Sequence, residues 1–249
     1  INYYIDLTLL GDIYSKGSWG AGVSMNYKVR YKFNGGLSFK YNRNILGYRG
    51  LSNYSASNMY SFRWMFTQDS KANPNSTFSA DVNMSSSNYD KYNSYNVNNY
   101  MTSTKQSSIS YSYSFPNSPF SMSMALKHSQ NSKTGSIDLT LPEIAFNMSR
   151  IYPFKHKKPK GKTRFYEKIS IAYNMNATNR VRTNDADFFN IPYDSITNGI
   201  MHKIPINASF KLFKYTTLTP TFNYNERWYF KKFDRQWDME SGQVVQDYA

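Results

Sequence analysis

Three things are missing from this chain of 249 residues: cysteine, helix-length apolar runs and a full complement of carboxylates. Without Cys, the chain can form neither disulfide bonds nor thiolate-based sites. No stretch approaches the roughly 18 consecutive apolar residues of a membrane-spanning helix, which excludes spanning by helices. The first residues carry no charged and then apolar leader, so we expect a mature chain or an excised part of a longer protein.

The shortage of carboxylates leaves a strong positive charge. Thirty Lys and Arg residues against sixteen Asp and Glu residues give a formal net charge of +14. Such an excess implies an anionic partner, and a nucleic acid, a membrane surface and an acidic glycan all fit at this point.

What the chain does have is aromatic residues in a strict alternation with polar ones. Its mean hydropathy is −0.67, yet 18% of its residues are aromatic, whereas disordered chains are poor in aromatic residues. In residues 107–126, aromatic and aliphatic side chains alternate with small, mostly serine residues on both sides of a turn at 116–119. Period-two alternation places the two sets on opposite faces of a strand, so this stretch predicts a two-faced β-hairpin.

The same alternation recurs along the chain and predicts an all-β antiparallel meander of about eleven strands. The expected strands are residues 4–14, 19–32, 37–46, 59–68, 78–85, 107–115, 120–127, 134–152, 165–176, 203–213 and 217–230. Many approach the ~9–11 residues that a tilted strand needs to cross a bilayer. A polar but aromatic-rich meander is typical of a β-barrel with a lipid face and a wet interior. We therefore expect residues 1–249 to be an incomplete segment of one large transmembrane outer-membrane β-barrel domain.

The connections between the expected strands carry two further predictions. Asn34-Gly35 predicts a hairpin turn at 33–36, and Pro142-Glu143 reverses the alternation within 134–152, which indicates either two strands or one strand with a bulge. A single bulged strand places the long loops at one end and the short connections at the other, as in outer-membrane barrels. The long loops are then 47–57, 87–104 and 177–201, and the other connections are 33–36, 69–75, 116–119, 153–162 and 214–216. On this ground we predict the bulge.

Basic side chains occupy the phase opposite to the aromatic residues. Because a charge facing lipid at mid-bilayer costs about 2–4 kcal/mol, these residues are expected to line the barrel lumen. The candidates are Lys28, Arg30, Lys32, Lys40, Arg63, Lys127, Lys168, Lys211 and Arg227. For any one of them the plainer interpretation is an ion pair with Asp81, Asp138 or a loop carboxylate. Nucleic-acid binding is disfavoured, since stacking platforms need aromatic and basic side chains on the same face.

The densest basic run forms a turn after the strand 134–152. It contains Lys155, Lys157, Lys158, Lys160 and Lys162. This basic turn could bind anionic headgroups or a periplasmic partner, and a solvated loop is an equally good interpretation.

No motif for catalysis or metal binding is present. His128, His156 and His202 lie far apart without metal-ligand spacing, and no Gly-x-Ser-x-Gly elbow occurs. A barrel-embedded Ser/His hydrolase could be built only on His128 or His202. Asn184-Asp185-Ala186-Asp187 offers oxygen ligands for a divalent cation, although a solvated loop explains it better. We expect no enzyme activity, no cofactor and no bound metal.

Several stretches resemble the LptD family of outer-membrane lipopolysaccharide-assembly proteins, in the form typical of Bacteroidetes. They are LLGDIYSKGSWG at 9–20, NYKVRY at 26–31, KANPNSTFSA at 71–80 and LTLPEIAFNMSRIYPF at 139–154. The resemblance implies a periplasmic jelly-roll and a very large barrel with a lateral gate between its first and last strands. By this resemblance the chain is an interior part of the barrel, with the jelly-roll and the gate strands outside it. The implied partners are lipopolysaccharide, outer-membrane lipids, a plug lipoprotein and periplasmic transport-bridge proteins, with no nucleic acid.

The resulting hypothesis is a barrel in the outer membrane of a Gram-negative bacterium that inserts lipopolysaccharide into the outer leaflet. Two alternatives stay open from the residues alone. One is a porin-like or nutrient channel for anionic solutes, and the other is a surface β-sandwich adhesin whose apolar faces pack against each other.

Overall fold

A computed structural model describes residues 3–93, 104–156, 164–184, 187–188, 190, 196–213, 215–231, 233–239 and 242–248. Almost all of the regular structure is β-strand, as expected from the alternation. The strands are β1 (Ile5–Ile13), β2 (Trp19–Val29), β3 (Phe33–Leu46), β4 (Ser55–Gln68), β5 (Ser76–Ser85), β6 (Thr104–Ser114), β7 (Phe120–Asn131), β8 (Ser136–Ile151), β9 (Ser170–Asn184), β10 (Thr197–Asn207), β11 (Phe210–Leu212), β12 (Thr216–Leu218), β13 (Thr221–Tyr229), β14 (Phe233–Asp238) and β15 (Gln243–Tyr248). The helices are α1 (Tyr89–Asn93) and the 3₁₀ helix η1 (Phe165–Lys168).

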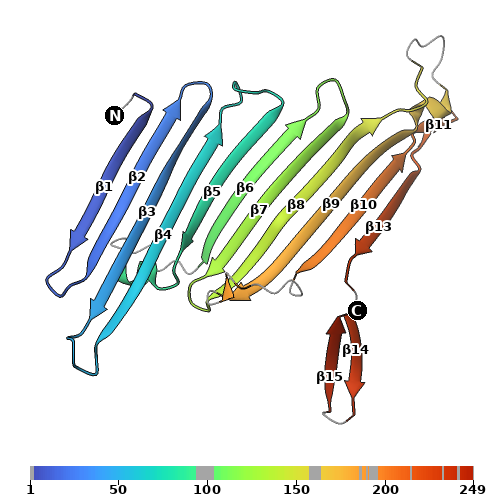
Figure 1. Ribbon diagram of the computed structural model, residues 1–249. Coiled ribbons are helices and arrows are strands. Elements are labelled where there is room, and N and C mark those ends of the chain that lie inside the picture. Colours follow the sequence, from blue (N-terminus) through green and yellow to red (C-terminus); the bar gives the residue numbers. More distant parts are fainter. Residues whose placement is uncertain are drawn as a thin grey trace. The chain divides into compact units, whose positions relative to one another are not determined.

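Eleven of the strands form one antiparallel sheet in meander order. The order is β1-β2-β3-β4-β5-β6-β7-β8-β9-β10-β13, while β11–β12 and β14–β15 are separate two-stranded hairpins. Figure 1 shows the strands from β1 to β5 side by side in the order of the sequence. The predicted all-β meander of about eleven strands is therefore confirmed. Each connection within it is local, because a neighbouring antiparallel strand can be reached by a short turn.

The chain divides into two compact units. The first comprises Ile1–Tyr113, Ala125–Leu141 and Val181–Ser195, and the second comprises Ser114–Met124, Pro142–Arg180 and Ile196–Ala249. In the first unit, β3 and β4 pair without interruption from Phe33↔Gln68 to Leu46↔Ser55. In the second unit, β10 and β13 pair from Gly199↔Tyr229 to Asn207↔Thr221.

The first hairpin turn lies three residues earlier than predicted. β2 ends at Val29, which pairs with Phe33 and accepts a hydrogen bond from the backbone of Lys32 (3.0 Å). The turn is therefore 30–32, and Asn34-Gly35-Gly36 lies inside β3. Gly35 has a packing role there, because a Cβ at this position would collide with the Tyr27 hydroxyl and the Met65 carbonyl.

The region around Pro142 is a single strand, as predicted. β8 runs without a break from Ser136 to Ile151. Before the phase slip, Asp138 accepts a hydrogen bond from Arg182 of β9, and after it the Phe146 ring contacts Tyr173 of β9. Arg182 and Tyr173 occupy opposite phases of β9, so the slip keeps the polar and aromatic phases of β8 matched to those of its neighbour.

The second half of the chain departs from the prediction in three places. Residues 165–168 form η1 rather than the start of a strand, because Ile169 and Glu167 donate i→i+3 hydrogen bonds to Tyr166 and Arg164. The tenth strand is residues 197–207 rather than 203–213, and the chain beyond it turns into the β11–β12 hairpin. The hairpin β14–β15 was not predicted at all.

Loop length does not separate the two ends of the sheet as cleanly as expected. The connection 152–169, at the end expected to carry short turns, is as long as 86–103 at the other end. The connection 208–220 at the same end contains the β11–β12 hairpin rather than a turn at 214–216. Length alone fails as a guide here, because connection 208–220 contains a hairpin and connection 152–169 ends in η1.

Candidate functional site

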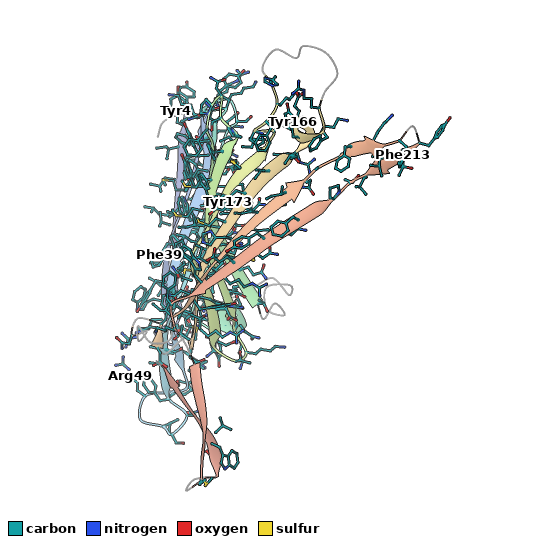
Figure 2. All side chains as sticks on the ribbon, turned by 90° about the vertical axis from the view of Figure 1, so that its right-hand side faces the viewer. Tyr4, Phe39, Arg49, Tyr166, Tyr173 and Phe213 are labelled. Carbon is teal, nitrogen blue, oxygen red and sulfur yellow. The ribbon has the colours of Figure 1, made fainter. Side chains whose placement is uncertain are left out.

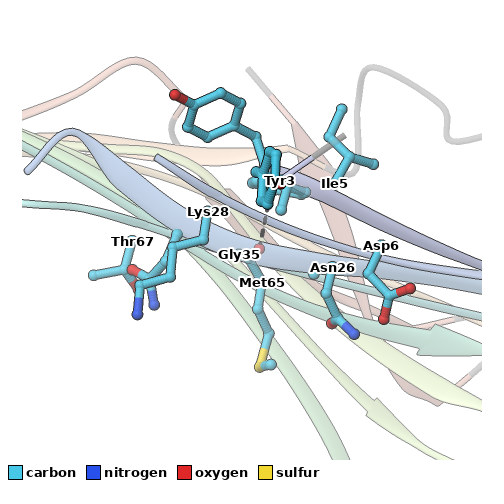
Figure 3. A pocket seen from close by; sticks show the side chains of 12 residues that line it. Tyr3, Ile5, Asp6, Asn26, Lys28, Gly35, Met65 and Thr67 are labelled. Atoms are coloured by element: carbon cyan, nitrogen blue, oxygen red, sulfur yellow. Dashed lines mark hydrogen bonds between the residues drawn. The ribbon is translucent and has the colours of Figure 1, made fainter. Parts of the chain in front are cut away.

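The first unit has one apolar and one polar face. Across four strands, Leu37 pairs with Met25 and Trp64, and Trp64 pairs with Val82. One residue along, Ser38 pairs with Ser24 and Arg63. Paired residues of antiparallel strands point to the same face, so the alternation of the sequence becomes two continuous surfaces. Figure 3 shows the separation near the start of the chain: Asp6, Asn26, Lys28 and Thr67 point to one side, and Tyr3 and Ile5 to the other.

The apolar face is built around rings that contact one another across strands. Phe66 lies 5.5 Å from Phe33 and 5.3 Å from Phe78, measured between ring centroids. Trp64 donates its indole N–H to the Tyr27 hydroxyl (2.9 Å), which in turn donates to the Met65 carbonyl (3.0 Å). These bonds satisfy the polar atoms of the rings, so the face stays apolar outward.

Much of this face is exposed. Leu9 is 75% and Ile13 90% exposed, and Phe39, at the middle of β3, is 40% exposed. Phe39 stands out from the strands in Figure 2. Among the described residues only seven apolar side chains are buried, so no second apolar layer covers the face, whereas a β-sandwich packs its inner faces together. An exposed apolar surface of this extent marks contact with lipid or with another protein.

Three predicted basic residues lie on the polar face of the first unit, and two of them are neighbours there. Lys40 of β3 pairs with Gly22 and Ser61, and Arg63 of β4 pairs with Ser38, two positions away. Lys28 of β2 lies on the same face nearer the turn 30–32, where it lines a hollow of about 550 Å³. All three side chains are exposed. We call Lys28, Lys40 and Arg63 the basic stripe.

The other predicted basic residues are spread over different elements. Arg227 lies on β13 and pairs with Met201, and Lys127 lies on β7. Arg30 and Lys32 belong to the turn 30–32 rather than to a strand, Lys168 is the last residue of η1, and Lys211 lies on the separate hairpin β11. The prediction that Arg30, Lys32, Lys168 and Lys211 lie on strands of the main sheet is wrong, because those strands begin and end at other residues than expected. Of the basic turn, Lys155 approaches the Tyr152 ring (5.9 Å), and Lys157, Lys158, Lys160 and Lys162 lie outside the described residues.

Neither of two ion pairs that lie within the described parts of the chain uses the basic stripe. Lys105 bonds Asp90 (2.5 Å), and Arg182 bonds Asp138 (2.9 Å). Asp138, one of the carboxylates expected to neutralise the candidates, thus bonds Arg182, which is not one of them. Within the described residues, Lys28, Lys40 and Arg63 take part in neither pair.

A short helix covers part of the polar face, which the sequence did not predict. Asn93 of α1 accepts a hydrogen bond from Asn44 (3.1 Å), and Lys105 bonds both Asp90 of α1 and Ser85. Below α1 is a hollow of about 510 Å³ whose lining includes Lys40 and Asn42. Tyr89 of α1 is 7% exposed, and burial, followed by the charges of Asp90 and Asp12, raises its pKa.

The two His residues considered for hydrolysis make contacts that do not form a triad. Ser107 lies 3.3 Å from His128, but its hydroxyl also donates to the Asn83 carbonyl and accepts from the Asn83 N–H. A serine held to the backbone in this way replaces a ladder bond of the sheet rather than acting as a nucleophile. His202 lies in the aromatic phase of the second unit, bonded to Tyr173 (2.7 Å) and 4.5 Å from the Trp228 ring. The Nε2 atoms of both His residues find no hydrogen-bond partner in the described structure, so no carboxylate orients either ring.

No group of three or more His, Asp or Glu side chains that could hold a metal ion occurs among the described residues. Of the loop that offered a divalent-cation site, Asp185 and Ala186 lie outside those residues. No helix in the described ranges has the length and apolar character needed to span a membrane.

The family comparison covers the whole chain. The family model described as LptD protein matches residues 1–249, a wider range than the stretches that carry the resemblance in the sequence. A search among curated proteins finds no match. The expected Bacteroidetes form and the interior position within the barrel stay predictions. The two-faced sheet and the match over residues 1–249 together show that the chain belongs to the LptD protein family, whose members take part in lipopolysaccharide transport and assembly at the outer membrane of Gram-negative bacteria.

Proposed function

We propose that this chain forms part of the wall of an outer-membrane β-barrel through which lipopolysaccharide is inserted into the outer leaflet. The observation that carries the proposal is the separation of the two faces in β1–β5, with exposed apolar side chains on one and the basic stripe on the other. The family match supports the same conclusion. In this arrangement the apolar face contacts lipid and the polar face lines the lumen.

The basic stripe gives the lumen a chemical role. Phosphate and carboxylate groups of lipopolysaccharide would form charge-assisted hydrogen bonds with Lys28, Lys40 and Arg63, which have no carboxylate at ion-pair distance among the described residues. Because the side chains are exposed on neighbouring strands, they can bind an anion and release it. No covalent bond is made or broken in this process, so the proposed role is non-enzymatic.

The proposed orientation places the turns 30–32 and 69–75 on the periplasmic side and α1 on the outer side. Periplasmic transport-bridge proteins would then deliver lipopolysaccharide at the end that carries these turns, and a plug lipoprotein would occupy the lumen. The interior position of this segment leaves the lateral gate to other strands.

The test is depletion of the full-length protein followed by complementation. Wild-type protein should restore surface lipopolysaccharide, and Lys40→Gln/Arg63→Gln should restore it only in part, because two of the three stripe cations are removed. Lys16→Gln/Lys133→Gln is the control, since it removes two exposed cations from turns and leaves the stripe intact. Normal surface lipopolysaccharide after depletion would refute the proposed function. Equal complementation by both double variants would refute the role of the stripe.

A further inference from the structure

The turn between β2 and β3 contains a strained aromatic residue. Tyr31 has φ +61°, in the left-handed region that Gly adopts freely and that a bulky residue rarely adopts. The strain persists because the pairing of Val29 with Phe33 leaves only three residues to reverse the chain. Backbone strain of this kind accumulates at functional positions, which raises the question of what the Tyr31 ring does.

The ring is in contact with two cations from different turns. The Arg30 guanidinium carbon and the Lys71 ammonium nitrogen each lie 4.7 Å from the centroid of Tyr31. A backbone hydrogen bond from Asp69 to the Lys32 carbonyl (2.8 Å) ties the turn 69–75 to the turn 30–32 and brings Lys71 to the ring. Two long, like-charged side chains are thus held against one aromatic group.

The one carboxylate of these two turns, Asp69, is not in an ion pair with either cation. The Asp69 carboxylate accepts a hydrogen bond from the backbone N–H of Lys71 (2.9 Å) and none from the ammonium group of that residue. In the described parts of the chain, Arg30 and Lys71 belong to no ion pair. Lys32 adds a further positive charge to the same turn, so the geometry favours an anion beside the ring.

We propose that Arg30, Tyr31 and Lys71 bind the phosphate of an anionic glycerophospholipid headgroup. The proposal rests on the outer-membrane role given above. Tyr31 is 48% exposed and carries a hydroxyl, and tyrosine is favoured where an apolar surface meets the headgroup layer. The two cations supply charge-assisted hydrogen bonds to phosphate.

The neighbouring apolar face explains why the ligand is a lipid rather than free phosphate. Phe33 follows two residues after Tyr31 and stacks on Phe66, with 5.5 Å between the ring centroids. An acyl chain attached to a phosphate at Tyr31 would therefore lie along rings that are already continuous across β3 and β4. Free phosphate would gain nothing from these rings.

The experiment uses the full-length protein in nanodiscs that contain phosphatidylglycerol and phosphatidylcholine, with native mass spectrometry to count retained lipids. The wild type should retain phosphatidylglycerol in preference to phosphatidylcholine. Arg30→Gln/Lys71→Gln should lower that preference about threefold or more, because two phosphate contacts are lost. Lys16→Gln is the matched control, since Lys16 lies 5.0 Å from the ring of Tyr48 as a single cation, and its preference should stay unchanged.

A second pair of variants separates binding from folding. Tyr31→Gly should raise the thermal midpoint of unfolding, because Gly adopts this φ without strain, while it lowers the preference for phosphatidylglycerol. Asn117→Gly is the control at another left-handed turn, with φ +55°, and should raise the midpoint slightly without changing lipid retention.

Any one of four results would overturn the headgroup site, and the first three come from the wild type, the variants and the competition experiment. These three are equal retention of both lipids by the wild type, unchanged retention in Tyr31→Gly, and displacement by inorganic phosphate as effective as that by phosphatidylglycerol. Preferential retention of purified lipid A over phosphatidylglycerol would also overturn it. None of these results bears on whether depletion lowers surface lipopolysaccharide, so the site and the proposed function can fail independently.

Discussion

The same four strands present two surfaces that are held together by different means. On the apolar face of β2–β5, rings contact rings, and the polar atoms of Tyr27 and Trp64 are satisfied locally. On the polar face, Lys40 and Arg63 stand among serine, asparagine and glycine with no carboxylate at ion-pair distance, and stabilising contacts come from the added helix α1. The difference shows that the apolar face is held by contacts between rings, whereas the charges of Lys40 and Arg63 on the polar face contribute no ion pair among the described residues.

A charge placed on the apolar face should give the largest effect. Phe39→Arg, at the middle of β3, is expected to lower the free energy of unfolding in vesicles by about 2–4 kcal/mol, because arginine at mid-bilayer must leave water. The matched change on the other face is Thr8→Arg, whose cross-strand neighbour is Ser24 and which lies away from the basic stripe. It should change stability by less than about 0.5 kcal/mol. A similar loss for both variants would show that the two faces do not have different environments.

The next largest loss of stability is expected from a substitution that breaks the attachment of α1 to the polar face. Lys105→Met leaves Asp90 and Ser85 without their cation. Because Asp90 keeps 22% of its side chain exposed, we expect a loss of about 2 kcal/mol rather than the larger cost of breaking a fully buried pair. Hydrogen exchange of residues 86–93 in the full-length protein measures it. Arg182→Met breaks a pair whose side chains are 75% and 44% exposed, and should leave that exchange unchanged.

The next prediction concerns the packing of the Tyr27 ring over Gly35 and its effect on the free energy of unfolding. Gly35→Ala is expected to destabilise the protein by about 1–3 kcal/mol, because the new methyl group meets the Met65 carbonyl as well as the Tyr27 ring. Gly36→Ala, one residue along and therefore on the polar face, meets only the flexible end of Asn26 at close range (2.9 Å). It should cost clearly less in the same denaturation experiment. Equal losses would mean that both faces are equally tightly packed at this point.

The smallest expected effect concerns pH. The pKa of Tyr89 in the folded protein is raised above its ordinary value of 10.0, first by burial and then by Asp90 and Asp12. The contribution of the neutral phenol is therefore fully present below pH 10.0 and is lost as the pH rises through the folded pKa. Hydrogen exchange of α1 should increase at that point and not in Tyr89→Phe. An increase of the same size in the variant would assign the transition to another group.

Local alternation was sufficient to predict most strands. The residues from Trp19 to Val29 and from Ser136 to Ile151 could be assigned because each follows a period of two, including the slip at Pro142. The turn at 30–32 could not be assigned, since Asn34-Gly35 is a stronger turn signal than Arg30-Tyr31-Lys32. Only the pairing of Val29 with Phe33 and the position of the Tyr27 ring explain why the glycine belongs inside a strand.

The sequence was enough to predict that the candidate site is basic. It was not enough to predict which basic residues share the polar face. Lys28, Lys40 and Arg63 were expected on the polar face and lie there, whereas Arg30 and Lys32 lie in a turn and Lys168 in η1. Their contact with lipopolysaccharide stays a prediction. The contact of Lys105 with Asp90 and Ser85 was missed because these partners are 15 and 20 residues away, and no local pattern reveals such a contact.

The alternating sequence is enough to specify a sheet with one aromatic and one polar face, because side chains of a strand alternate whatever surrounds it. Where the chain turns, which cations are neighbours and that a helix covers part of the polar face are specified by the three-dimensional fold. These features depend on the register between strands and on contacts between residues distant in the sequence. A register shift of one residue would move every side chain of a strand to the other face.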